Sequence, residues 1–201
     1  MEGALAAAAL LAGPPPARCV AADPAAAQID AFDAALLETM KAGKALGPEG
    51  RYRKLEPAVR RAFDLGTMTR FTVGLSWAQI PPATQQALAA AFERLTVASY
   101  AHNFDGWSGE TFVADPNVIT RGPDKLVRTQ IISPHDAPVA ISYRLRQSGG
   151  AWKIIDVLYN GSISQLTTRR ADFAATLAQE GPAGLAAHLN ALADHELKGG
   201  D

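Results

Sequence analysis

The sequence predicts an α+β fold, a curved antiparallel sheet of four strands with several helices packed on it. Helical patterns extend to Tyr100 and resume after Gly161, and four consecutive strand-like runs lie between them. Short segments rich in Gly, Pro, Ser and Asp separate these runs, and consecutive strands joined by short turns pair antiparallel. Such a sheet either packs solidly against its helices or encloses an apolar pocket, and the periodicity alone does not distinguish the two.

The two runs at 138–146 and 151–159 form the centre of this sheet, and the turn Ser148-Gly149-Gly150 joins them. In the first run, alternation places one apolar set on a single face, namely Val139, Ile141, Tyr143 and Leu145. The second run is apolar on both faces, with Trp152, Ile154 and Leu158 on one and Ile155, Val157 and Tyr159 on the other. We therefore expect this strand to be central and covered on both sides.

The remaining helices follow from apolar spacing and from helix breakers. Asp23-Pro24 is typical of a helix start, and the helix that follows is predicted to end near Gly47-Pro48. Two further helical stretches precede a connection around Trp77, and a long helix runs from Pro82 to Tyr100. After the sheet, a helical pattern begins at Ile163, breaks at Gly181-Pro182 and resumes to about Leu192.

The composition excludes several classes of protein. With 201 residues, 48% of them hydrophobic, and a net charge of −1, the chain fits one globular domain with a sizeable core and gives no electrostatic case for binding nucleic acid. Residues 1–22 hold a short apolar segment and small residues before Ala22, which predicts a signal peptide, although Glu2 and the absence of Lys or Arg near the start are atypical. A disordered leader is the alternative. In either case residues 23–201 form the predicted domain.

Side chains suited to catalysis are sparse. Cys19, the only cysteine, falls in the expected leader, and His188 and His195 are seven positions apart on a predicted helix, too far for both to hold one metal ion. We therefore predict no metal site and no cofactor. Asp156 interrupts an apolar strand, so it is the candidate carboxylate of an acid–base site with Tyr143 or Tyr159 as donor. The alternative is that Asp156 bonds to backbone, Arg144 or Arg170 and holds the sheet to a helix.

Two segments carry a distinctive series of motifs, GGAWKIIDVLYNGSISQLTTRRADFAATLAQEGPAGLAAHLNAL and AFDLGTMTRFTVGLSWAQIPPATQQALAAAFERLTVASYAHNF. Both segments resemble the MlaC (toluene-tolerance) family of periplasmic lipid-binding proteins. The tryptophan–lysine strand, the glycine–serine step, the arginine-x-x-phenylalanine helix and the Phe-Asp pair occur in the family's order. The resemblance extends from about Ile29 to about Leu197, and the variant around Gly161 and Thr168 is closest to the hopanoid-associated HpnM branch.

The resemblance implies a non-enzymatic periplasmic carrier that buries the hydrocarbon part of a phospholipid or hopanoid-like lipid, leaves the head group outside, and exchanges lipid with a membrane-bound ABC-type transporter. On this basis the residues expected to contribute to the cavity are Trp77, Phe92, Leu95, Tyr100, Ile141, Tyr143, Leu145, Ile154, Val157, Tyr159, Ile163, Leu166 and Phe173. Two alternatives stay open. An isomerase or dehydratase using Asp156 would have a small pocket with a polar base, and a packed interaction module would have no pocket.

Overall fold

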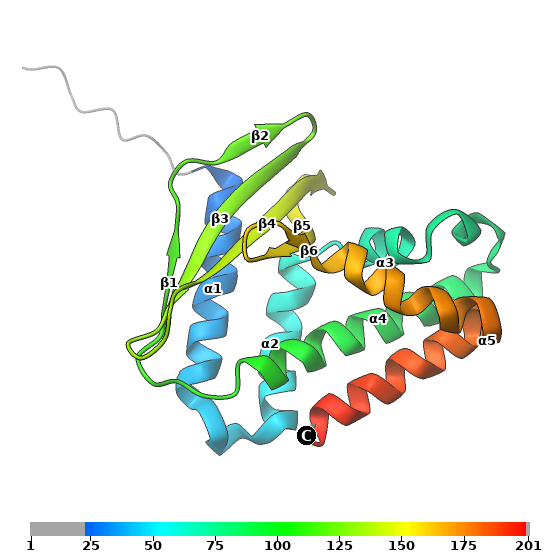
Figure 1. Ribbon diagram of the computed structural model, residues 1–201, viewed down its shortest axis with the longest axis horizontal. Coiled ribbons are helices and arrows are strands. Elements are labelled where there is room, and N and C mark those ends of the chain that lie inside the picture. Colours follow the sequence, from blue (N-terminus) through cyan, green and yellow to red (C-terminus); the bar gives the residue numbers. More distant parts are fainter. Residues whose placement is uncertain (1–22, 200–201) are drawn as a thin grey trace, which may run out of the picture.

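The computed structural model describes residues 23–199 and consists of an antiparallel sheet with helices packed on it (Figure 1). The predicted α+β class is confirmed. In chain order the elements are α1 (Pro24–Ala42), η1 (Gly43–Leu46), α2 (Gly47–Ala62), α3 (Leu65–Val73), η2 (Gly74–Gln79), α4 (Pro82–Asn103), β1 (Thr111–Ala114), β2 (Ile119–Arg121), β3 (Asp124–Ile132), β4 (Val139–Ser148), β5 (Ala151–Tyr159), β6 (Ile163–Ser164) and α5 (Gln165–Leu197). The predicted leader, residues 1–22, lies outside the described residues.

The sheet has the strand order β1-β3-β4-β5-β6, with β2 also paired to β3, and every pairing is antiparallel. The predicted number of strands was too small. The run at 111–119 divides in two because the side chain of Asp115 accepts a hydrogen bond from the backbone nitrogen of Asn117 at 2.8 Å, which turns the chain. Ile163 was predicted to lie on a helix. It belongs instead to β6, where it pairs with Tyr159 of β5, and it is 51% exposed.

A register shift between β4 and β5 corrects the predicted faces of β5. Arg144 pairs with Asp156 but Leu145 pairs with Ile154, so Ile155 is the extra residue of a β-bulge. Because the bulge reverses the alternation, Ile154 and Val157 face the same side, together with Tyr143 of β4. This side, called the inner face below, packs against the helices.

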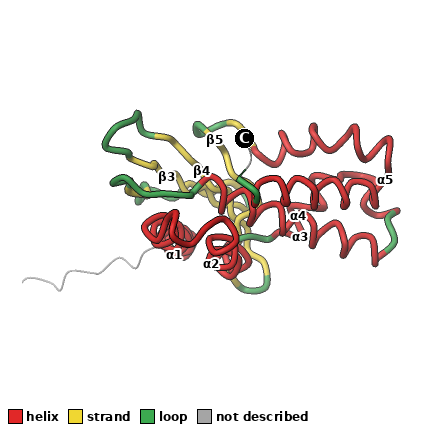
Figure 2. Tube along the Cα trace, turned by 90° about the horizontal axis from the view of Figure 1, so that it is seen from below, coloured by secondary structure: helices red, strands yellow, loops and turns green. Residues whose placement is uncertain are grey.

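The first helices lie against the sheet (Figure 2). Helix α1 begins as predicted, because the side chain of Asp23 caps it by accepting a hydrogen bond from the backbone nitrogen of Ala25 at 2.9 Å. It ends earlier than predicted, at Ala42, where Gly43 adopts a φ of 53°. The short turn η1 follows, and α2 starts at Gly47, the position where sequence breakers indicated an end.

Helices α3 and α5 and much of α4 extend away from the sheet (Figures 1 and 2). The predicted break is confirmed as a sharp bend inside α5, because Gly181 has non-helical angles (φ 70°) and Pro182 follows it. The two arms of α5 therefore fold back on one another, orange and red in Figure 1. The second arm is fixed to α4 by Arg94, whose Nη1 donates to the carbonyl oxygen of Asn190 at 2.9 Å.

An aromatic cluster joins the helices to the inner face of the sheet. The ring of Phe32 on α1 makes edge contacts with Phe63, Tyr100 and Tyr143, with centroids 5.2, 5.3 and 6.3 Å away. These four residues belong to α1, the end of α2, α4 and β4, so one cluster fixes the relative positions of four elements. Among residues 23–199, no helix is both long enough and apolar enough to cross a membrane.

Candidate functional site

A pocket of about 560 Å³ lies between the inner face of the sheet and helices α3, α4 and α5. Its buried base is apolar and comes from Phe63, Met68, Phe92 and Leu166. Strands β3, β4 and β5 supply the opposite wall. The complete lining is Phe63, Met68, Phe92, Thr96, Ser99, Tyr100, Asn103, Phe104, Ile131, Val139, Ile141, Val157, Tyr159, Gln165, Leu166 and Arg169.

Part of the predicted cavity set lines this pocket. The residues that the structure brings together there are Phe92, Tyr100, Ile141, Val157, Tyr159 and Leu166. Leu145 and Ile154 are fully buried in the core, and Leu95, Tyr143 and Phe173 are nearly so. Trp77 on η2 packs against the same core from outside, and Ile163 is on the surface. These seven residues support the walls or lie away from the pocket.

Three of the ten lining residues that the sequence reasoning missed belong to one face of α4. Thr96, Ser99 and Asn103 follow Phe92 at spacings of three or four residues, so they share its helical face, and Phe104 comes just after the helix. Helical spacing from Phe92 could have identified them, but polar side chains are not expected in a lipid cavity. Ile131 and Val139 come from the β3–β4 hairpin.

Of the described residues that line this pocket, Arg169 is the only one with a formal charge. Its guanidinium carbon lies 5.5 Å from the ring centroid of Phe92, and its Nη1 is buried without a hydrogen-bond partner among the described residues. Burial lowers the pKa of the Arg169 guanidinium from its ordinary value. Arginine stays charged at any physiological pH, so the pocket carries one positive charge on an otherwise neutral lining.

Asp156, the candidate carboxylate of the alternative acid–base site, has a structural role. One Asp156 carboxylate oxygen accepts a hydrogen bond from Ser164 Oγ at 2.7 Å, and the other accepts one from the backbone nitrogen of Leu166 at 3.2 Å. A nitrogen of Arg144 lies 3.8 Å away. The prediction that Asp156 holds the sheet to a helix is therefore confirmed. Tyr143 and Tyr159 lie on the inner face and Asp156 on the outer one, so the proposed acid–base pair does not come together.

A second aspartate is buried without an opposite charge. Asp33 on α1 is 5% exposed, and its Oδ1 has no hydrogen-bond partner among residues 23–199. Burial, with a smaller contribution from Asp30, raises the pKa of Asp33 to about 7, although a hydrogen bond from Tyr143 opposes the shift. Asp33 does not line the pocket. Its burial in a raised-pKa state makes the stability of the fold depend on pH.

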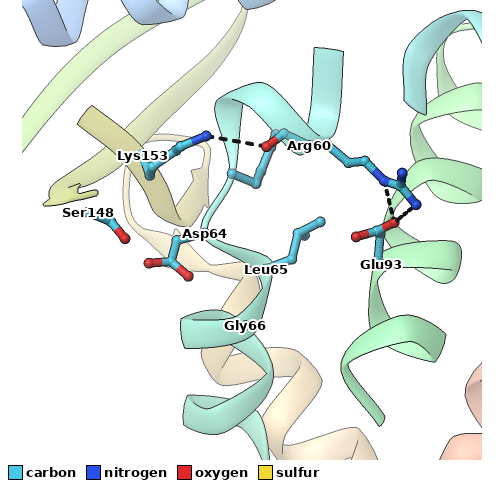
Figure 3. A pocket seen from close by; sticks show the side chains of 8 residues that line it. Arg60, Asp64, Leu65, Gly66, Glu93, Ser148 and Lys153 are labelled. Carbon is cyan, nitrogen blue, oxygen red and sulfur yellow. Dashed lines mark hydrogen bonds and ion pairs between the residues drawn. The ribbon is translucent and has the colours of Figure 1, made fainter. Parts of the chain in front are cut away.

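A smaller pocket of about 280 Å³ between α2, α4 and β5 is polar (Figure 3). The side chain of Arg60 bonds to Glu93 at 2.6 Å, and Lys153 Nζ donates to the carbonyl oxygens of Arg60 and Arg61. Asp64 accepts a hydrogen bond from the backbone nitrogen of Thr67, which caps α3. These polar groups are satisfied by each other, so the arrangement fixes the end of α2 rather than presenting free groups to a ligand.

A third pocket, of about 600 Å³, lies on the outer face of the sheet between β1, β2, β3 and β4. Polar side chains such as Arg121, Arg128 and Gln130 border it, and Arg128 is already paired with Asp115 at 2.6 Å. It has no aromatic base. Among residues 23–199, no group of three His, Cys, Asp or Glu side chains is placed to hold a metal ion. The inner pocket is therefore the candidate site for an apolar ligand.

Comparison with known proteins identifies the family. Residues 30–191 match the family described as "MlaC protein". No curated protein matches the chain. Among solved structures, the phospholipid-binding protein from Ralstonia solanacearum, in complex with a phospholipid, aligns with a TM-score of 0.75 and 22% sequence identity, covering 87% of this chain and 99% of that chain. At this identity the similarity shows a common fold.

Proposed function

Because this chain belongs to the MlaC protein family, we propose that it is a lipid carrier that encloses the hydrocarbon tails of a phospholipid in the inner pocket. The single observation that carries the proposal is the pocket itself, whose base is built from buried Phe63, Met68, Phe92 and Leu166. The Ralstonia protein of the same fold was solved with a phospholipid bound, which supports the class of ligand.

The size of the pocket fits one acyl chain. If a methylene group occupies about the volume of a water molecule, roughly 30 Å³, the volume of about 560 Å³ holds on the order of 15 to 20 such groups. Burying about 15 methylenes is worth roughly 12 kcal/mol. A two-chain phospholipid would need additional volume for its second tail.

The finer parts of the proposal rest on family membership. They are a periplasmic location, transfer of lipid between the inner and outer membranes, and exchange with membrane-bound ABC-type transporter components. A polycyclic hopanoid-like lipid is the alternative ligand. The structural hydrogen bonds of Asp156 disfavour the alternative that the protein is an isomerase or dehydratase. The inner pocket disfavours the alternative of a solidly packed interaction module.

A pair of matched tryptophan variants tests the proposal. Val157 faces the pocket from β5, whereas Val113 on β1 lies on the outer face of the sheet. Val157→Trp places an indole in the space for the acyl chain, at a folding cost of about 1 to 3 kcal/mol, and Val113→Trp controls for the added ring. We expect delipidated V157W to take up at least about tenfold less phosphatidylglycerol from vesicles than V113W or the unmodified protein.

Thermal unfolding followed by circular dichroism establishes that both variants are folded under the assay conditions. Equal uptake by V157W and V113W would place lipid binding outside the inner pocket and refute the proposed site. Absence of uptake by the unmodified protein would refute the carrier function itself.

A further inference from the structure

Among residues 23–199, the only charged side chain that lines the inner pocket belongs to Arg169, on the second turn of α5. Leu166, one turn earlier on α5, lines the same pocket, and the guanidinium of Arg169 lies over the ring of Phe92, with 5.5 Å between the guanidinium carbon and the ring centroid. The aromatic face stabilises the cation in part, but it provides no acceptor in the plane of the guanidinium.

Within residues 23–199, Arg169 has no protein anion as its partner. Nη1 is buried and makes no hydrogen bond, and none of the ion pairs formed by these residues includes Arg169. Glu196 and Asp172 on α5 act on it through their charges without forming an ion pair with it, and burial raises the pKa of the Tyr100 hydroxyl on α4, so that group stays neutral. The half-buried guanidinium therefore keeps one buried nitrogen without an acceptor, which carries a desolvation cost that a bound anion would offset.

Other polar groups in the pocket add hydrogen-bonding capacity but no negative charge. Gln165 is one turn before Arg169, while Ser99 and Asn103 are one turn apart on α4, and all three line the same space. No Asp or Glu of the described part of the chain is among the lining residues. The pocket therefore combines an apolar base with an electropositive wall, an arrangement that suits a ligand with an oxyanion attached to a hydrocarbon chain.

We propose that Arg169 binds the anionic group of the lipid, so that the carrier selects anionic amphiphiles over neutral lipids of the same chain length. This inference rests on the function proposed above. The phosphodiester of a phospholipid and the carboxylate of a free fatty acid share the required chemistry. Either would accept two parallel hydrogen bonds from a guanidinium, which a lysine ammonium cannot reproduce.

The test compares three lipids on delipidated full-length protein: dioleoylphosphatidylglycerol, dioleoylglycerol and oleate. Arg169→Met removes the charge and keeps a long apolar side chain, while Arg169→Lys keeps the charge and loses the forked geometry. Arg170→Met is the matched control, because Arg170 is the next residue of α5, is exposed and does not line the pocket. Circular dichroism melting establishes that each variant is folded.

We expect the unmodified protein and R170M to bind phosphatidylglycerol roughly 10- to 100-fold more tightly than dioleoylglycerol. R169M should reduce that ratio to about one, chiefly by weaker binding of the anionic lipid, and R169K should fall between them. If oleate rather than phosphatidylglycerol shows the dependence on Arg169, the bound oxyanion is a carboxylate.

An unchanged preference in R169M for both anionic lipids would overturn the inference but leave the carrier function intact. Failure of the unmodified protein to bind any of the three lipids would overturn both. The two failures are therefore distinguishable in one set of measurements.

Discussion

Replacing Asp33 by Asn should change how the stability of the protein depends on pH. In the folded protein this carboxyl is buried on α1, beside Tyr143, and its pKa is raised to about 7. In the unfolded chain it returns to its ordinary value of 3.8. Asparagine has nearly the same shape and keeps an oxygen that can accept the hydroxyl of Tyr143, but it does not ionise.

The sign and size of the effect follow from proton linkage. Between pH 3.8 and about 7 the folded protein retains the Asp33 proton and the unfolded chain does not, so the free energy of unfolding falls as the pH rises through this window. A pKa difference of about three corresponds to roughly 4 kcal/mol in total. Above about pH 7 the contribution is constant. Asp33→Asn removes it, so the variant gains on the unmodified protein as the pH increases.

Urea unfolding followed by circular dichroism measures this difference between about pH 4.5 and about pH 8. We expect the stability of D33N relative to the unmodified protein to rise by about 3 kcal/mol over that range. Asp30→Asn, which removes an exposed carboxyl of the same helix, should leave most of the pH dependence in place. A difference between D33N and the unmodified protein that does not vary with pH would show that Asp33 titrates near its ordinary pKa.

Three other substitutions test how the site is supported. Asp156→Ala should lower the free energy of unfolding by about 2 to 3 kcal/mol, because the hydrogen bonds to Ser164 and to the start of α5 are lost. Folded D156A should retain lipid in extraction assays, whereas a selective loss of turnover on a small substrate would favour an enzyme. Leu145→Ala should cost about 2 to 5 kcal/mol in urea unfolding, since Leu145 is fully buried, and a cost below about 1 kcal/mol would contradict the packing described. Gly74→Ala should cost about 1 to 2 kcal/mol in the same assay, because Gly74 has a φ of 76° and its added methyl group would lie 3.0 Å from Arg170; a neutral result would mean that the turn relaxes freely.

The elements that the sequence predicted well are those whose signals are local. Asp23-Pro24 marks the start of α1, and Gly181-Pro182 marks the bend in α5, because capping and the missing proline N–H depend only on neighbouring residues. The division of the 111–119 run was missed, since the side chain of Asp115 that turns the chain reads equally well as part of a polar strand face.

The site was harder to predict because it depends on long-range register. The bulge between β4 and β5 places Ile154 and Val157 on one face, although strict alternation assigns them to opposite faces. Helical spacing predicted that Phe92 and Tyr100 both belong to the cavity, but it gave no reason to include Arg169 among the lining residues. Arg169 lines the pocket only because α5 packs against α4 and the sheet.

The lipid content of the protein purified from lipid-replete cells is the most direct test of whether it carries a phospholipid. Organic extraction followed by mass spectrometry, normalised to protein concentration, gives the number of lipid molecules per chain. The account predicts about one phospholipid per chain, a stoichiometry that roughly 12 kcal/mol of burial per acyl chain would preserve through purification. Protein that purifies free of lipid, and that takes up none when incubated with vesicles, would contradict it.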